Sequence, residues 1–210
     1  MQTRQGQSIE DASMSIIEDE IVSHDYDTWE WPIVRRIIHS TADFDFARDN
    51  RVIFHDDAIQ SGIKSLNNGC NIITDVNGIP GLLNKRNLAD FGNNTICKIS
   101  DDKIANLAKK ANSTRARVSM QQSAAEMENG VVVIGNAPTA LLEVISMIHQ
   151  NEARPSLVVG VPVGFIQAAE SKAELEKIQV PYITNRGRKG GSPVAAAIIN
   201  ALFKLLRSSP

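Results

Sequence analysis

The chain has 210 residues, of which 42% are apolar and 22% charged, the usage of an ordinary globular protein. Its formal net charge of -2 excludes the broad positive field of a general nucleic-acid binder. No apolar run reaches the roughly 18 residues that a membrane span needs, and the first thirty residues carry no signal-peptide pattern, so we expect a cytoplasmic protein.

Two helices are predicted in the first part of the chain. Residues 8–22 open with the capping pattern of Ser8 and Asp11 and then place isoleucines at near-helical intervals. Pro32 suits the first turn of a second helix, which continues through Ile33, Ile37 and Ile38. His39 is therefore expected at or near the C-terminal end of that helix.

From residue 51 onward, short β-branched runs alternate with amphipathic stretches. Strands are predicted at 52–54, 71–74, 95–97, 131–134, 157–159 and 181–184. Helices are predicted at 58–66, 103–110, 114–128, 139–149, 168–178 and 193–206, with a long loop or short helix at 79–94. Because most strands are continuously apolar and are followed by helices, we expect a mostly parallel sheet with helices on both faces. This is a three-layer, doubly wound α/β fold, and we expect one domain over residues 1–210.

Ligands of such folds bind beyond the carboxyl ends of the strands. The loops after the last three strong strands are 135–138, 160–165 and 185–192. In the last of these, residues 186–192 place three cations and three glycines before a predicted helix, a pattern that favours anion binding by free N–H groups and the helix dipole. Neither the P-loop nor the dinucleotide-binding glycine pattern is present. The sequence predicts a carboxylate or phosphate cradle here, with a solvated basic turn as the alternative.

His39 is the candidate proton-transfer residue. It follows Arg36 by three residues and stands where a helix should end, so its ring can be partly exposed. An imidazole with the ordinary pKa of about 6.5 can give and take a proton near neutral pH. A histidine that merely caps its helix is the alternative interpretation.

No metal site is predicted. His55 with the two aspartates after it could suggest one, but an Asp-rich helix start explains the same residues, and the other histidines lack ligand spacing. Cys70 and Cys97 stand outside any C-x-x-C pair. The segments at Thr114 and at Asn136 either leave backbone donors facing a ligand or hold plain helix caps.

Four segments, in order, resemble one known family. Residues 35–44 read R-R-I-I-H-S-T-A-D-F, residues 134–141 read I-G-N-A-P-T-A-L, residues 160–172 contain P-V-G-F and A-A-E-S-K, and residues 186–192 read R-G-R-K-G-G-S. Together they resemble the precorrin-8X methylmutases over nearly the whole chain, from about residue 13 to its end. The resemblance implies an isomerase of cobalamin biosynthesis without a separate cofactor. Its reaction moves a methyl group from carbon 11 to carbon 12 of precorrin-8X or cobalt-precorrin-8, giving hydrogenobyrinate or cobyrinate; the T-A-D-F segment is more similar to cobalt-using members.

The resemblance also implies roles for individual residues. His39 becomes the proton donor and acceptor, since protonation of the conjugated macrocycle eases the methyl shift. The substrate is a flat tetrapyrrole fringed with carboxylates, which guanidinium groups can bind bidentately. Matching to the family motifs gives the expected substrate contacts Ser13, Arg36, Arg115, Arg186, Arg188 and Ser192. A homodimer with clefts near the subunit interface is implied as well, with neither a nucleic-acid nor a membrane partner.

Two other functions fit parts of this pattern. An α/β isomerase or binding domain for a phosphorylated small metabolite would use residues 186–192 as a phosphate cradle. A catalytically silent tetrapyrrole carrier would keep the arginines and dispense with His39. The presence of His39 within its full motif argues against the carrier.

Overall fold

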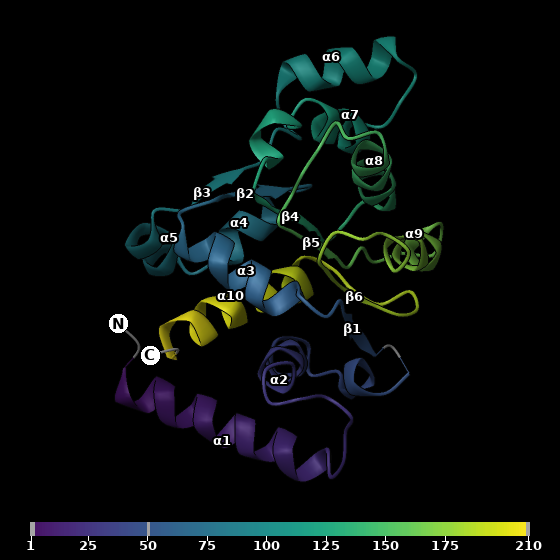
Figure 1. Ribbon diagram of the computed structural model, residues 1–210. Coiled ribbons are helices and arrows are strands. Elements are labelled where there is room, and N and C mark those ends of the chain that lie inside the picture. The colour runs from purple at the N-terminus through teal and green to yellow at the C-terminus, as the bar shows by residue number, and fades with distance from the viewer. Residues whose placement is uncertain (1–2, 50, 209–210) are drawn as a thin grey trace.

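The structure is a computed structural model that describes residues 3–49 and 51–208. Its six strands form one sheet in the order β1-β6-β5-β4-β2-β3 (Figure 1). Neighbouring strands are parallel except β1, which runs antiparallel to β6 at one edge. The strand bounds are β1 Val52–Phe54, β2 Asn71–Thr74, β3 Asn94–Ile96, β4 Val131–Ile134, β5 Leu157–Gly160 and β6 Tyr182–Asn185. This confirms the mostly parallel sheet of the predicted α/β fold.

The central strands are buried on both faces, which explains their continuous apolar sequences. Every residue of β4 is buried, and successive side chains point to opposite faces of the sheet. Val131 and Val133 belong to one hydrophobic cluster, while Val132 and Ile134 belong to another. The sheet thus separates two cores, each covered by its own layer of helices.

One core lies beneath α10 (Ser192–Ser208), which packs against α2 (Trp31–Thr41), α3 (Ala58–Asn67) and α4 (Gly78–Leu82). The other lies beneath α7 (Arg115–Gln121), α8 (Pro138–His149) and α9 (Ala168–Leu175) (Figure 1). Further out, α6 (Asp102–Lys110) packs on α7, and α1 (Arg4–Glu20) packs on α2. None of the helices within the described residues is long and apolar enough to cross a bilayer.

Several predicted elements differ from the structure. The helix predicted at 168–178 ends at Leu175. Helix α1 begins earlier than expected because Thr3, not Ser8, is its cap: the Thr3 hydroxyl accepts the N–H of Gly6 at 3.1 Å. The helix predicted at 114–128 is divided into α7 and the 3₁₀ turn η2 (Ala125–Met127). Between them, the buried hydroxyl of Ser123 donates to Ser119 O, a local bond that competes with regular helix. The stretch 79–94, expected to be a long loop or a short helix, holds two short helices: α4, which already begins at Gly78, and α5 (Lys85–Phe91).

Candidate functional site

Two loops at the carboxyl edge of the sheet are hydrogen-bonded to each other. We call residues 161–167, after β5, the apolar loop, and residues 186–191, after β6, the basic loop. The N–H of Gly164 donates to Arg188 O at 3.1 Å, and the N–H of Gly191 donates to Val161 O at 2.9 Å. Gly190 permits this approach, since its φ is +154° and a Cβ there would lie 2.2 Å from Val161 O. The two loops therefore present one joint surface.

A buried lysine anchors the basic loop from the protein interior. Lys172 of α9 is 1% exposed, and its Nζ donates to Lys189 O at 2.7 Å and to Asn185 Oδ1 at 3.3 Å. The Asn185 amide in turn donates to the carbonyls of Arg186 and Lys189 at 2.9 and 3.0 Å. Burial lowers the pKa of Lys172 to about 8. The loop backbone is thus fixed from beneath by side chains that do not reach its surface.

The three cations of the basic loop have different surroundings. Arg186 Nη2 lies 3.4 Å from Glu176 Oε2, while Lys189 Nζ lies 2.7 Å from Asp43 Oδ2 and 2.5 Å from Asp45 Oδ2. Among the described residues, Arg188 has no ion-pair partner. Its charge is therefore the one most available to an incoming carboxylate, whereas Lys189 is already neutralised.

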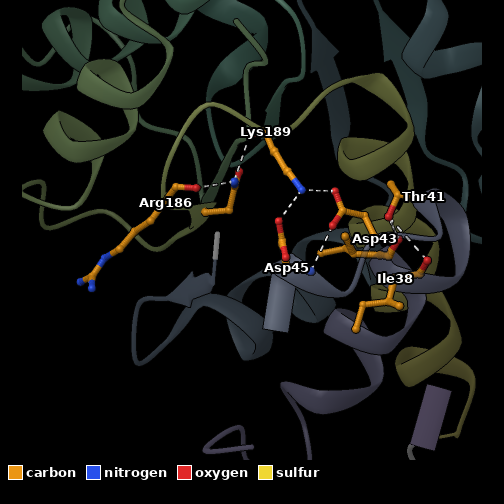
Figure 2. Close-up of polar contacts among 8 residues, drawn as sticks. Ile38, Thr41, Asp43, Asp45, Arg186 and Lys189 are labelled. Carbon is orange, nitrogen blue, oxygen red and sulfur yellow. Dashed lines mark hydrogen bonds and ion pairs between the residues drawn. The ribbon is translucent and has the colours of Figure 1, made fainter. Parts of the chain in front are cut away.

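Lys189 ties the basic loop to the chain that follows helix α2. Figure 2 shows its side chain pointing to Asp43 and Asp45, while Arg186 points away from this cluster. Asp43 caps the 3₁₀ turn η1 (Phe44–Ala47) by accepting the N–H of Asp45. Asp43 follows His39 by four residues in the sequence. The ion pairs of Lys189 with Asp43 and Asp45 therefore hold the C-terminal end of α2, where His39 lies, beside the basic loop.

His39 lies in the last turn of α2, as predicted, and is half-buried. Burial lowers its pKa below the ordinary value, and Arg36 lowers it further; Glu10 opposes the shift, and Lys204 adds to it. Arg36 Nη1 lies 2.7 Å from Glu10 Oε1, and Lys204 Nζ lies 3.6 Å from the same oxygen. His39 therefore stands in a charged cluster formed by α1, α2 and α10.

The remaining predicted contact residues are spread over the molecule. Arg36 is occupied by Glu10, and Ser13 on α1 donates its hydroxyl to Ile9 O of its own helix at 2.8 Å. Ser192 is the half-buried first residue of α10. Arg115 is exposed at the start of α7, on the other face of the sheet from α2, and has no ion pair among the described residues. The structure thus links His39 with the basic loop and leaves Arg115 apart.

The backbone donors at Asn136 are not free for a ligand. The buried carboxylate of Asp75, directly after β2, accepts the N–H groups of Gly135, Asn136 and Ala137 at 3.0, 2.9 and 2.6 Å. Burial raises the pKa of Asp75, and these three donors oppose that rise. The expectation that this loop could offer its N–H groups to a substrate is wrong, because an internal carboxylate already fills the position. At Thr114 the cap interpretation holds, since its hydroxyl accepts the N–H of Arg117.

Two cavities lie away from these residues. One, of 180 Å³, is lined by residues that include Glu30, His55 and Gln60. The other, of 420 Å³, opens at the amino-terminal edge of the sheet beside Lys64 and Asn129. Neither is lined by any of the predicted site residues. In a single chain, the candidate site is therefore an open surface and not one of these pockets.

Comparison with known proteins agrees with the motifs on this surface. Residues 8–205 match the family model described as Precorrin-8X methylmutase. The chain belongs to the precorrin-8X methylmutase family. A relative from Priestia megaterium named Cobalt-precorrin-8 methylmutase is 46% identical and covers 98% of this chain and 91% of its own length. One of the same name from Leptospira interrogans is also 46% identical and covers 97% and 95%.

A solved methylmutase has the same fold. The crystal structure titled Precorrin-8x Methyl Mutase from Thermus thermophilus superposes with a TM-score of 0.88 at 36% identity, over 96% of both chains. The α/β fold described above is therefore shared with a methylmutase of known structure.

Sequence reasoning missed the residues that position this site. Asp75 follows the strand run N-I-I-T directly, and a carboxylate after a buried strand was the available signal. Lys172 belongs to the A-A-E-S-K motif, but the sequence alone does not indicate what its side chain binds. In the sequence, Lys189 is one of three cations in residues 186–192 and Asp43 is part of the T-A-D-F motif, and no pattern marks Asp45. Their partners lie far away along the chain, so no local pattern could pair them.

Proposed function

We propose that this chain is a cobalt-precorrin-8 methylmutase, which moves the methyl group from carbon 11 to carbon 12 of the macrocycle and yields cobyrinate. The two 46% identical relatives carry that name, and the T-A-D-F segment after His39 favours the cobalt-bearing substrate. The observation that carries the proposal is the position of His39, half-buried at the helix end that Lys189 ties to the basic loop. The proposed proton-transfer residue, His39, and the proposed carboxylate-binding loop are thereby held next to each other.

The chemistry assigned to His39 is reversible proton transfer to the conjugated ring. In the free protein its lowered pKa favours the neutral imidazole at neutral pH. A substrate that brings several carboxylates to this region favours the charged form and raises that pKa again. Substrate binding itself would then supply the imidazolium that donates the proton, and the neutral ring left behind can accept a proton in return.

Two measurements test this function directly. Titration of the protein with cobyrinate should shift the visible absorption spectrum of the corrinoid. Incubation with cobalt-precorrin-8 should then convert it to cobyrinate without added cofactor. A protein that leaves both spectra unchanged has a different function, with the phosphorylated-metabolite alternative next in line.

Arg188→Ala should weaken cobyrinate binding by roughly tenfold or more, because a hydrogen bond to a charged group is worth about 1.5 to 3 kcal/mol. The sequence predicts the same loss for Arg186→Ala, but the contacts of the two side chains support different losses. Arg186 faces Glu176 at 3.4 Å, and removal of Arg186 leaves Arg188 in place. We expect the Arg186 variant to lose less affinity than the Arg188 variant, as measured by absorbance titration. Unchanged affinity in both variants would make the basic loop ordinary solvated surface.

We further propose a homodimer, located in the cytoplasm, in which the second chain completes the substrate cleft. Arg115 and His39 belong to opposite faces of one chain, so a single copy does not surround a broad macrocycle. Helix α1 also exposes Ile9 and Ile16 by 62% and 57%, on a face that the described residues leave uncovered.

Light scattering should therefore give twice the chain mass of 22.9 kDa. The expected result is a dimer at micromolar concentration, with or without corrinoid. A mass of one chain under both conditions contradicts the shared cleft. Fractionation of cells that express the protein checks the cytoplasmic location.

A further inference from the structure

The tip of the apolar loop exposes two large apolar side chains. Phe165 is 86% exposed and Ile166 is 82% exposed, and Val163 nearby is 44% exposed. The tip is flanked by residues with positive φ, Gly164 at +156° and Gln167 at +61°. A non-glycine residue such as Gln167 adopts this conformation only at an energetic cost. The chain thus accepts backbone strain in a segment that holds an aromatic ring in solvent.

This tip is fixed beside the unpaired cation of the basic loop. The guanidinium carbon of Arg188 lies 5.8 Å from the centre of the Phe165 ring. The bond from the Gly164 N–H to Arg188 O joins the two segments at this point, and Lys172 holds the basic loop from the interior. An apolar surface and a positive charge without an ion-pair partner in the described chain are therefore presented together.

That combination matches the chemistry of a tetrapyrrole. The macrocycle offers a broad apolar face, and its carboxylates lie around the rim. An aromatic side chain pairs well with a conjugated face through burial and stacking, while an arginine binds a carboxylate at the edge. Clustered exposed apolar residues commonly mark sites that a ligand or partner covers.

We propose that Phe165 and Ile166 form a platform on which one face of the macrocycle packs, with Arg188 binding a carboxylate at its rim. This inference rests on the proposed function and deepens it, since it assigns the surface that recognises the ring rather than its acidic groups. The competing occupant is a second copy of this chain, in which case the tip is part of the subunit interface.

The test compares Phe165→Ser and Ile166→Ser with the parent by absorbance titration with cobyrinate. Loss of one buried large apolar side chain corresponds to roughly a ten- to hundredfold loss of affinity, and we expect this for Phe165→Ser. Ile166→Ser should lose less, and Phe165→Leu should recover part of the affinity. Val22→Ser is the matched control, because Val22 is 91% exposed and lies outside both loops; it should bind cobyrinate as the parent does.

Stability and mass are measured for the same variants. Phe165 and Ile166 contribute little to the core, so the melting temperature should not change, and light scattering should give the parental mass. Weaker binding with parental mass supports the platform. Parental affinity in both serine variants overturns it, and so does a change of mass, which would assign the tip to the subunit interface. If the parent binds no cobyrinate, the proposed function fails and the platform fails with it.

Discussion

His39→Asn should lower isomerase turnover by about 10² to 10⁴-fold, the usual contribution of a general acid-base group. Asparagine keeps a similar size and can form hydrogen bonds, but it cannot carry a proton. Affinity for cobyrinate should stay near the parental value, because one half-buried ring at the end of α2 adds little beside arginine contacts and burial of the macrocycle. The loss should therefore appear in kcat and not in binding.

His149→Asn is the control for this substitution. His149 is the exposed last residue of α8, on the other side of the sheet from α2, and its replacement should leave kcat unchanged. His39→Ala should also fold normally, which separates chemistry from packing. Turnover by His39→Asn above about a tenth of the parental rate would show that His39 is only a helix cap.

The pH dependence of the parent gives an independent check on the same residue. If the imidazolium donates the proton, kcat/KM must fall as the pH rises through the pKa of His39 in the free protein. Because burial and Arg36 lower that pKa, the fall should begin below about pH 6.5, the ordinary value for histidine. The residual turnover of His39→Asn should not show this limb.

Asp75→Asn should reduce the free energy of unfolding by about 1 to 3 kcal/mol, a substantial share of the usual 5 to 15 kcal/mol. The carboxylate of Asp75 accepts three backbone N–H groups in a fully buried position. The more favourable orientation of an asparagine amide places its oxygen where Oδ2 lies, so that it accepts the N–H groups of Asn136 and Ala137. Its NH₂ group then faces the N–H donor of Gly135. The buried N–H group of Gly135 loses its acceptor, and the loop before α8 loses part of its anchor.

Urea unfolding of Asp75→Asn and of Asp101→Asn would measure this effect. Asp101 is exposed at the N-cap of α6, and its side chain makes no capping hydrogen bond. Its replacement should change stability by no more than about 0.5 kcal/mol. A loss below about 1 kcal/mol for Asp75→Asn would mean that the three bonds contribute little to folding.

The sequence by itself determined the class of fold and pointed to the loops that form the candidate site. The buried strands of this sheet have to be apolar on both faces. The continuous apolar runs 131–134 and 157–159 can therefore be identified as strands from the sequence alone. Pro32 likewise marked the start of α2 and thereby placed His39 at its end. The glycines and cations of 186–192 identified a loop at the carboxyl edge. Local patterns could be read because each follows from the geometry of its own segment.

Only the tertiary structure decided which charges are available. Lys189 meets Asp43 from 146 positions away along the chain, and Arg186 lies near Glu176. These contacts leave Arg188 as the cation of the basic loop without an ion-pair partner among the described residues. In the same way, Asp75 accepts the N–H groups of the loop that begins at Gly135, 60 positions away. From the sequence alone, those N–H groups could have been available to a ligand. Charge pairing and hydrogen-bond satisfaction depend on distances between elements, and the packing of helices on the sheet fixes those distances.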